Sequence, residues 1–90
     1  MPSTLKRIRT NAFLLQQGHC IYCHKQMWLS DLADFAVEHK ITVKQARHLQ
    51  CTAEHLRARK DGGGNTASNI AAACLFCNVR RHKRKANLTP

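Results

Sequence analysis

The chain has 90 residues, which is enough for one hydrophobic core and excludes a second one. A core this small is marginal, because a chain of about this size buries only about 60% of the surface of its unfolded form. The five cysteines therefore point to disulfides or a metal as additional support. The net charge of +10 favours a polyanionic partner, with nucleic acid favoured over a membrane surface.

The cellular compartment decides between disulfides and a metal. Residues 1–7 contain basic side chains, but no apolar run follows them of the kind found in a signal peptide. The longest apolar stretch, Ile70 to Cys77, is far shorter than the roughly 20 residues that cross a membrane. We therefore expect a cytoplasmic location without membrane contact, where thiols stay reduced and paired cysteines serve as metal ligands before disulfides.

The N-terminal half is predicted to be helical. Residues 3–17 carry apolar side chains at every third or fourth position, and Gly18 stands where this helix would end. The apolar positions are Leu5, Ile8, Ala12 and Leu15. Residues 29–49 indicate one or two further short helices, the second with Thr42 as its N-cap, and we interpret this region as scaffold.

The C-terminal half predicts two short strands and a helix. Residues 51–56 are the first strand, and the Gly-rich segment 61–65 is a loop. Residues 70–73 are the second strand, although alanine is a poor strand former. From Leu75 onward a helix runs into the basic tail, so the expected fold class is α+β.

Two Cys-x-x-Cys pairs predict a structural zinc site. Cys20 and Cys23 form the first pair, and Cys74 and Cys77 form the second. Thiolates at this spacing bind one tetrahedral ion, and four of them leave no open position for water. Such an ion would join the two halves of the chain and stabilise it without taking part in catalysis.

Other interpretations of the cysteines stay open on the sequence alone. Four buried thiols or disulfides would leave the same pattern, and His19 or His24 could replace one of the ligands. Cys51 belongs to neither pair and is expected to be a small buried hydrophobe.

Four polar residues carry chemistry when they are taken together: Glu54, His55, Asn69 and Asn78. Each alone has a simpler interpretation, as part of a surface dipeptide, a turn or a cap. In this order, with a Gly-rich loop after His55 and a Cys-x-x-Cys directly before Asn78, they resemble the HNH endonuclease family. The resemblance is tight over residues 51–82, and the upstream Cys-x-x-Cys is similar to that of the zinc-binding four-cysteine subgroup.

The resemblance implies a fold and an activity. The fold is a ββα-metal core of two short antiparallel strands, a loop and a helix, at about residues 51–85. With N-terminal helices and a four-cysteine zinc site, this core would form a single HNH nuclease domain over residues 1–90. The implied activity is hydrolysis of DNA phosphodiester bonds, as a nickase or a double-strand endonuclease.

The resemblance also implies a role for each of the four polar residues. Glu54 and Asn78 would hold one catalytic divalent ion, and their oxygen atoms suit Mg²⁺ or Mn²⁺. His55 would be the general base that takes a proton from the attacking water. Asn69 would hold the loop and the His55 ring in position.

Three positions depart from the family pattern. Ala58 replaces a frequent Pro, Glu54 replaces the more usual Asp, and Asn78 replaces His. His82 lies one helical turn beyond Asn78 and could contribute a further metal ligand. Because neighbours on a strand point to opposite faces, the first strand should also end or distort near Glu54 and His55.

Basic residues gather in the loop and near the C-terminus, where we expect them to bind the phosphates of duplex DNA. They are Arg57, Arg59, Lys60, Arg80, Arg81, Lys83, Arg84 and Lys85. A merely solvated basic surface is the alternative. Four aromatic side chains could stack on bases, although packing in the core or around the cysteines is favoured. These are Tyr22, Trp28, Phe35 and Phe76.

Two other functions and the oligomeric state stay open on the sequence alone. A non-catalytic zinc-stapled module would bind nucleic acid through the same basic surface, but it does not explain the four polar residues in register. An interaction domain with a degenerate site is disfavoured by the intact ligand positions. Cleavage of DNA that needs a divalent ion would distinguish a nuclease from these two alternatives. The chain could act as a monomer or as a homodimer.

Overall fold

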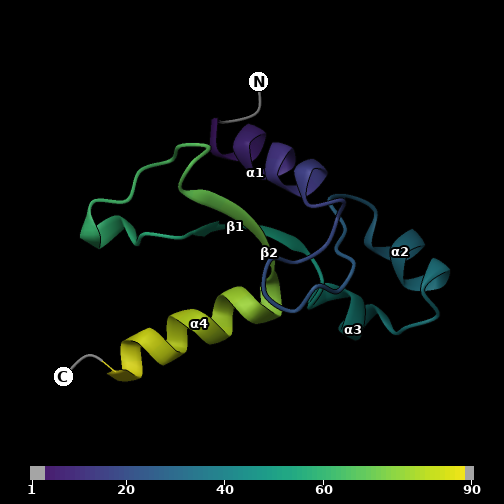
Figure 1. The fold of residues 1–90 in the computed structure, drawn as a ribbon. Helices are drawn as coiled ribbons and strands as arrows, with labels where there is room; N and C mark the ends of the chain where they lie inside the picture. Colours follow the sequence, from purple (N-terminus) through teal and green to yellow (C-terminus); the bar gives the residue numbers. More distant parts are fainter. Residues whose placement is uncertain (1–3, 89–90) are drawn as a thin grey trace.

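The computed structural model describes the backbone of residues 4–88 and the side chains of residues 4–82. In chain order the elements are α1 (Thr4–Leu15), α2 (Leu32–Glu38), α3 (Val43–Arg47), β1 (Cys51–His55), a 3₁₀ turn (Arg59–Asp61), β2 (Ile70–Cys74) and α4 (Leu75–Leu88). The two strands form an antiparallel sheet between α1 and α4, and α2 and α3 pack on each other beside it (Figure 1). The predicted small α+β fold with a strand–loop–strand–helix core is confirmed. No helix within residues 4–88 is long and apolar enough to span a membrane.

The sheet is a regular hairpin in which every residue of β2 is buried. Cys51 pairs with Cys74 at one end, and His55 pairs with Ile70 at the other. An isolated two-stranded hairpin is at best marginally stable in water, so this one depends on the helices that cover it. The three alanines of β2, at positions 71–73, let helices approach both faces of the strand, and this burial outweighs the weak strand preference of alanine.

The end of α1 differs in detail from the prediction. The amide of Gly18 donates to the carbonyl of Phe13 at 2.8 Å, and Gln17 and Gly18 both have positive φ angles of 55° and 78°. This is the hydrogen bond of a Schellman end, and a side chain at Gly18 would collide with Gln26. The helix packs on the core through Ala12 and Phe13, whereas Leu15 is 86% exposed.

The α2–α3 pair has the short helices that the sequence predicts. Thr42 caps α3 in a reciprocal capping box with Gln45. The pair buries its own small cluster of Phe35, Ala36 and Ala46, and the Trp28 indole donates to the carbonyl of Ala46 at 2.7 Å. Two of the four aromatic residues are therefore used as scaffold.

Candidate functional site

Four cysteine sulfurs come together at the end of the hairpin. Cys20 and Cys23 lie in the turn after α1, which we call the knuckle (residues 18–28), and Cys74 and Cys77 lie where β2 passes into α4. All four sulfurs lie within 4.8 Å of one another, and those of Cys23 and Cys74 are 3.8 Å apart. A tetrahedral zinc with Zn–S bonds of about 2.3 Å would separate its sulfurs by about 3.8 Å. The predicted pairing of the two motifs into one candidate metal site is confirmed.

The backbone around the cluster is arranged to stabilise thiolates. The Cys20 sulfur accepts from the amides of Tyr22, at 3.4 Å, and of Cys74, at 3.3 Å. Burial opposes ionisation, but these backbone hydrogen bonds prevail and lower the pKa of Cys20 to about 7. Burial raises the pKa of Cys74 and of Cys77, and a neighbouring thiol adds to the rise at Cys77. A divalent cation at the centre would reverse this rise, because it stabilises the thiolate form.

Cys51 lies next to the cluster but is not part of it. Its side chain is 2% exposed, and burial raises the pKa of its thiol to about 11. The grouped ligand atoms found within the described residues are those of the four paired cysteines, without His19 or His24. The cluster therefore offers four sulfurs to one ion and has no water position of its own.

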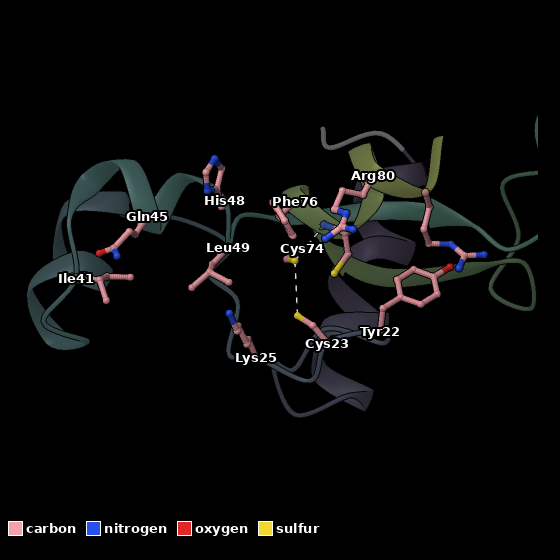
Figure 2. A pocket seen from close by; sticks show the side chains of 12 residues that line it. Tyr22, Cys23, Lys25, Ile41, Gln45, His48, Leu49, Cys74, Phe76 and Arg80 are labelled. Atoms are coloured by element: carbon pink, nitrogen blue, oxygen red, sulfur yellow. Dashed lines mark hydrogen bonds between the residues drawn. The ribbon is translucent and has the colours of Figure 1, made fainter. Parts of the chain in front are cut away.

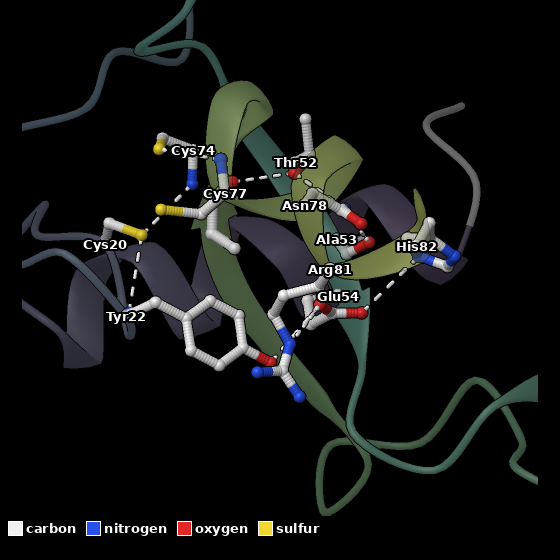
Figure 3. A network of polar contacts seen from close by, with 11 residues as sticks. Cys20, Tyr22, Thr52, Ala53, Glu54, Cys74, Cys77, Asn78, Arg81 and His82 are labelled. Atoms are coloured by element: carbon white, nitrogen blue, oxygen red, sulfur yellow. Dashed lines mark hydrogen bonds and ion pairs between the residues drawn. The ribbon is translucent and has the colours of Figure 1, made fainter. Parts of the chain in front are cut away.

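The acidic residue of the motif is buried on the α4 side of the hairpin. Glu54 is only 1% exposed, and its Oε2 accepts a hydrogen bond from the Tyr22 hydroxyl at 3.2 Å (Figure 3). Arg81 Nε lies 3.5 Å from the same oxygen, and the Arg81 guanidinium lies 4.2 Å from the centre of the Tyr22 ring. Burial and the nearby Glu54 carboxylate raise the pKa of Tyr22 to about 12, so the hydroxyl keeps its proton and remains a donor.

The second oxygen of Glu54 is in a different situation. Among the described residues Oε1 has no hydrogen-bond partner, although it is buried, and it faces His82 Nε2 at 3.7 Å. Asn78 lies one turn earlier on α4, and its amide nitrogen donates to Thr52 Oγ1 at 3.0 Å and to the Ala53 carbonyl at 3.2 Å. These contacts use the amide nitrogen and leave the amide oxygen as the atom that could bind an ion.

His55 lies at the last position of β1, next to the loop. Its Nε2 contacts Asn65 Oδ1 at 2.7 Å, and because an amide oxygen only accepts, the ring nitrogen is the donor. The other ring nitrogen, Nδ1, then carries the lone pair. The strand ends at His55 with regular pairing, so Glu54 and His55 direct their side chains to opposite faces of the hairpin.

Asn69 organises the loop between the strands. Its side chain accepts from the Arg57 amide at 2.8 Å and donates to the Arg57 carbonyl at 3.1 Å and the Gly64 carbonyl at 2.9 Å. The hydrogen bond to the His55 ring comes from Asn65 instead. Asn69 therefore fastens the loop that carries Asn65.

Comparison with known families gives this segment a name. Residues 45–84 match the family model described as HNH endonuclease. This segment is similar to an HNH endonuclease domain. The resemblance inferred from the sequence is thereby confirmed, and at the level of the family it supports a nuclease-type hydrolase with a nucleic-acid substrate. No curated protein and no solved structure matches the chain.

The segment that matches the HNH model begins after the first cysteine pair. The sulfur cluster therefore combines two cysteines from the matched segment with two that precede it. Gln45 to Arg84 contain Cys74 and Cys77, whereas Cys20 and Cys23 precede the matched segment. The knuckle is thus joined to the HNH domain both by the sulfur cluster and by the Tyr22–Glu54 hydrogen bond.

The basic residues predicted to bind DNA fall into three groups. Arg57, Arg59 and Lys60 are exposed at the start of the loop, and Arg80 is exposed on α4. The side chain of Arg81 is 44% exposed, and its guanidinium contacts Glu54 and Tyr22. Arg81 is therefore less available to a phosphate than the other basic residues. The side chains of Lys83, Arg84 and Lys85 lie outside the described part of the chain.

Two neighbours of the site could not be found from sequence motifs. Tyr22 touches Glu54 across a long sequence separation, and no pattern links a knuckle tyrosine to a strand carboxylate. Asn65 had a weak signal, because it follows the glycine run of the loop, but nothing distinguished it from an ordinary turn residue.

Proposed function

We propose that the chain is a metal-dependent endonuclease that hydrolyses phosphodiester bonds of DNA, with a structural Zn²⁺ in the four-cysteine cluster. The observation that carries the proposal is the orphaned oxygen of Glu54. A buried carboxylate oxygen without a donor costs free energy, and here it faces a histidine nitrogen at 3.7 Å. A divalent cation is the partner that would satisfy this oxygen and bind His82 at the same time.

The donor set fits a catalytic ion of the Mg²⁺ or Mn²⁺ kind. Glu54 Oε1 and the Asn78 amide oxygen are hard ligands suited to such ions, and His82 Nε2 favours a transition metal such as Mn²⁺. When bound, the ion would neutralise charge on the phosphate and on the leaving oxygen. Tyr22 and Arg81 hold Oε2, so Oε1 is kept pointing away from them.

His55 is the proposed general base. With its Nε2 proton donated to Asn65, its Nδ1 is free to accept a proton from water. Because Glu54 and His55 face opposite sides of the hairpin, a phosphodiester at the end of β1 would have the ion on one side and the activated water on the other. In-line displacement requires the attacking water and the leaving oxygen on opposite sides of the phosphorus atom, and this arrangement would allow it.

We expect Asn65→Ala to reduce the cleavage rate about tenfold. The substitution removes a hydrogen bond that fixes the His55 tautomer, and one such bond contributes about 0.5–1.5 kcal/mol. Because Asn65 acts through His55, kcat should fall while KM stays the same. Asn65→Asp retains an accepting oxygen and should recover most of the rate. Equal kcat for Asn65→Ala and the parent chain would remove Asn65 from the site.

The proposal as a whole is tested by cleavage of supercoiled plasmid. Zinc-loaded protein is incubated without added ion, with Mg²⁺ and with Mn²⁺, and its zinc content is measured after each incubation. We expect nicked circles only where Mg²⁺ or Mn²⁺ is present, since a chain with one site cuts one strand at a time. Binding of the plasmid without cleavage under every condition would favour the non-catalytic zinc-stapled module instead.

A further inference from the structure

A cavity of about 740 Å³ is lined by Tyr22 and Arg81, the two residues that contact Glu54, and by residues of other elements (Figure 2). Its walls come from the knuckle, from the α3 segment and from the first turns of α4. The size is within the range of cavities that hold small organic ligands. Three of the cluster cysteines line one end, and the rest of the cavity extends away from them toward Ile41 and His48.

The most distinctive wall is an exposed aromatic ring. Phe76 is 46% exposed, so its ring is not buried in the core, and it lines the cavity together with three of the cluster cysteines. The Arg80 guanidinium lies 5.3 Å from the ring centroid, and the His48 ring lies 5.8 Å from it. An exposed ring with a cation and an imidazole beside it is a stacking surface for another flat group.

The lining of the cavity carries cationic side chains that can bind a phosphate. No Asp or Glu is among the lining residues, whereas Lys25, Arg80 and Arg81 are. A zinc bound by four thiolates would contribute two negative charges at one end of the cavity. Because Arg81 is paired with Glu54, Lys25 and Arg80 are left to balance this charge, and Arg80 lies at the stacking surface.

We propose that this cavity takes one unpaired nucleobase of the DNA, stacked on Phe76, with the adjoining phosphates on Arg80 and Lys25. The inference rests on the proposed nuclease function and names its substrate class. A paired base has both faces covered by its neighbours and cannot enter a concave site, whereas an unpaired or flipped base can. The preferred substrate is therefore duplex DNA with an unpaired base near the cut.

The geometry of α4 places this base close to the scissile phosphate. Phe76 and Arg80 form one ridge of the helix, and Asn78 and His82 form another, because residues four apart share a face. A helix with its side chains is about 10–12 Å wide, and each nucleotide of a stacked strand rises about 3.4 Å along the duplex axis. A strand that crosses α4 between the two ridges would span about three nucleotides.

The test compares two duplexes that differ by one bulged nucleotide, placed about three nucleotides from the nick position. Affinity is measured with zinc-loaded His55→Ala protein, so that the DNA stays intact. We expect the bulged duplex to bind at least about tenfold more tightly, as base–aromatic stacking provides. Phe76→Leu keeps an apolar side chain but should abolish the preference, provided that its zinc content is unchanged.

Val79→Ala is the matched control. Val79 is 42% exposed on the same helix but does not line the cavity, so its loss should leave the preference intact. Equal affinity for the two duplexes, or a preference that survives Phe76→Leu, would overturn the inference. Cleavage of the paired duplex by the parent chain is scored separately, so failure of the nuclease proposal and failure of the base site give different results.

Discussion

Cys74→Ser is expected to leave the chain unfolded and without bound zinc. Cys74 is 1% exposed and joins β2 to the sulfur cluster. Structural zinc contributes about 10–16 kcal/mol of apparent binding free energy, which equals or exceeds the whole free energy of unfolding of a typical domain, about 5–15 kcal/mol. Circular dichroism during thermal melting, together with zinc analysis of the purified protein, measures both effects.

Cys51→Ala is the control for this substitution. Cys51 is as deeply buried as Cys74 and pairs with it across the sheet, but it lies outside the sulfur cluster. We expect this variant to keep one zinc per chain and to melt cooperatively, at a somewhat lower temperature. A Cys74→Ser protein that melts like Cys51→Ala would show that zinc does not hold the fold together.

His55→Ala is expected to lower the cleavage rate by about 10²–10⁴-fold, the usual contribution of a general base. The fold should be preserved, because the His55 side chain lies at the end of β1 and bonds to Asn65 on the exposed loop. Single-turnover cleavage of a labelled duplex measures the rate, and the zinc content and melting temperature are measured on the same preparations.

His39→Ala serves as the matched histidine control. His39 is exposed at the end of α2, where its ring contacts that of Phe35, and it lies outside the matched segment and is not among the proposed site residues. Its rate should equal that of the parent chain. If His55→Ala retains the parent rate as well, another group activates the water, and our assignment of the base is wrong.

The sequence predicted those parts of the molecule that depend on local spacing. Two cysteines separated by two residues bind an ion from one turn, so the cluster could be expected from its two motifs. Residues 51–56 and the glycine run after them were likewise predicted to be a strand and a loop. The Thr42 cap followed from the same kind of local rule.

The sequence could not predict contacts between elements that are distant in the chain. The burial of Glu54 depends on Tyr22 and Arg81, which come from two other parts of the chain. Without knowledge of these neighbours, a carboxylate on a strand is expected to lie on the surface. The exposure of Leu15 and of Phe76 depends on where a helix crosses the sheet, which a periodic pattern does not specify. The hydrogen bond from His55 to Asn65 depends on the path of the loop.

Tyr22 contacts both the sulfur cluster and the proposed site of the catalytic ion. Its amide donates to the Cys20 sulfur, and its hydroxyl donates to Glu54. A knuckle released from zinc would also release the oxygen that keeps Glu54 oriented, so the second ion would reach full affinity only after zinc has bound. Zinc would therefore bind before the catalytic ion. A chelator that removes only zinc would stop cleavage, just as removal of the catalytic ion does.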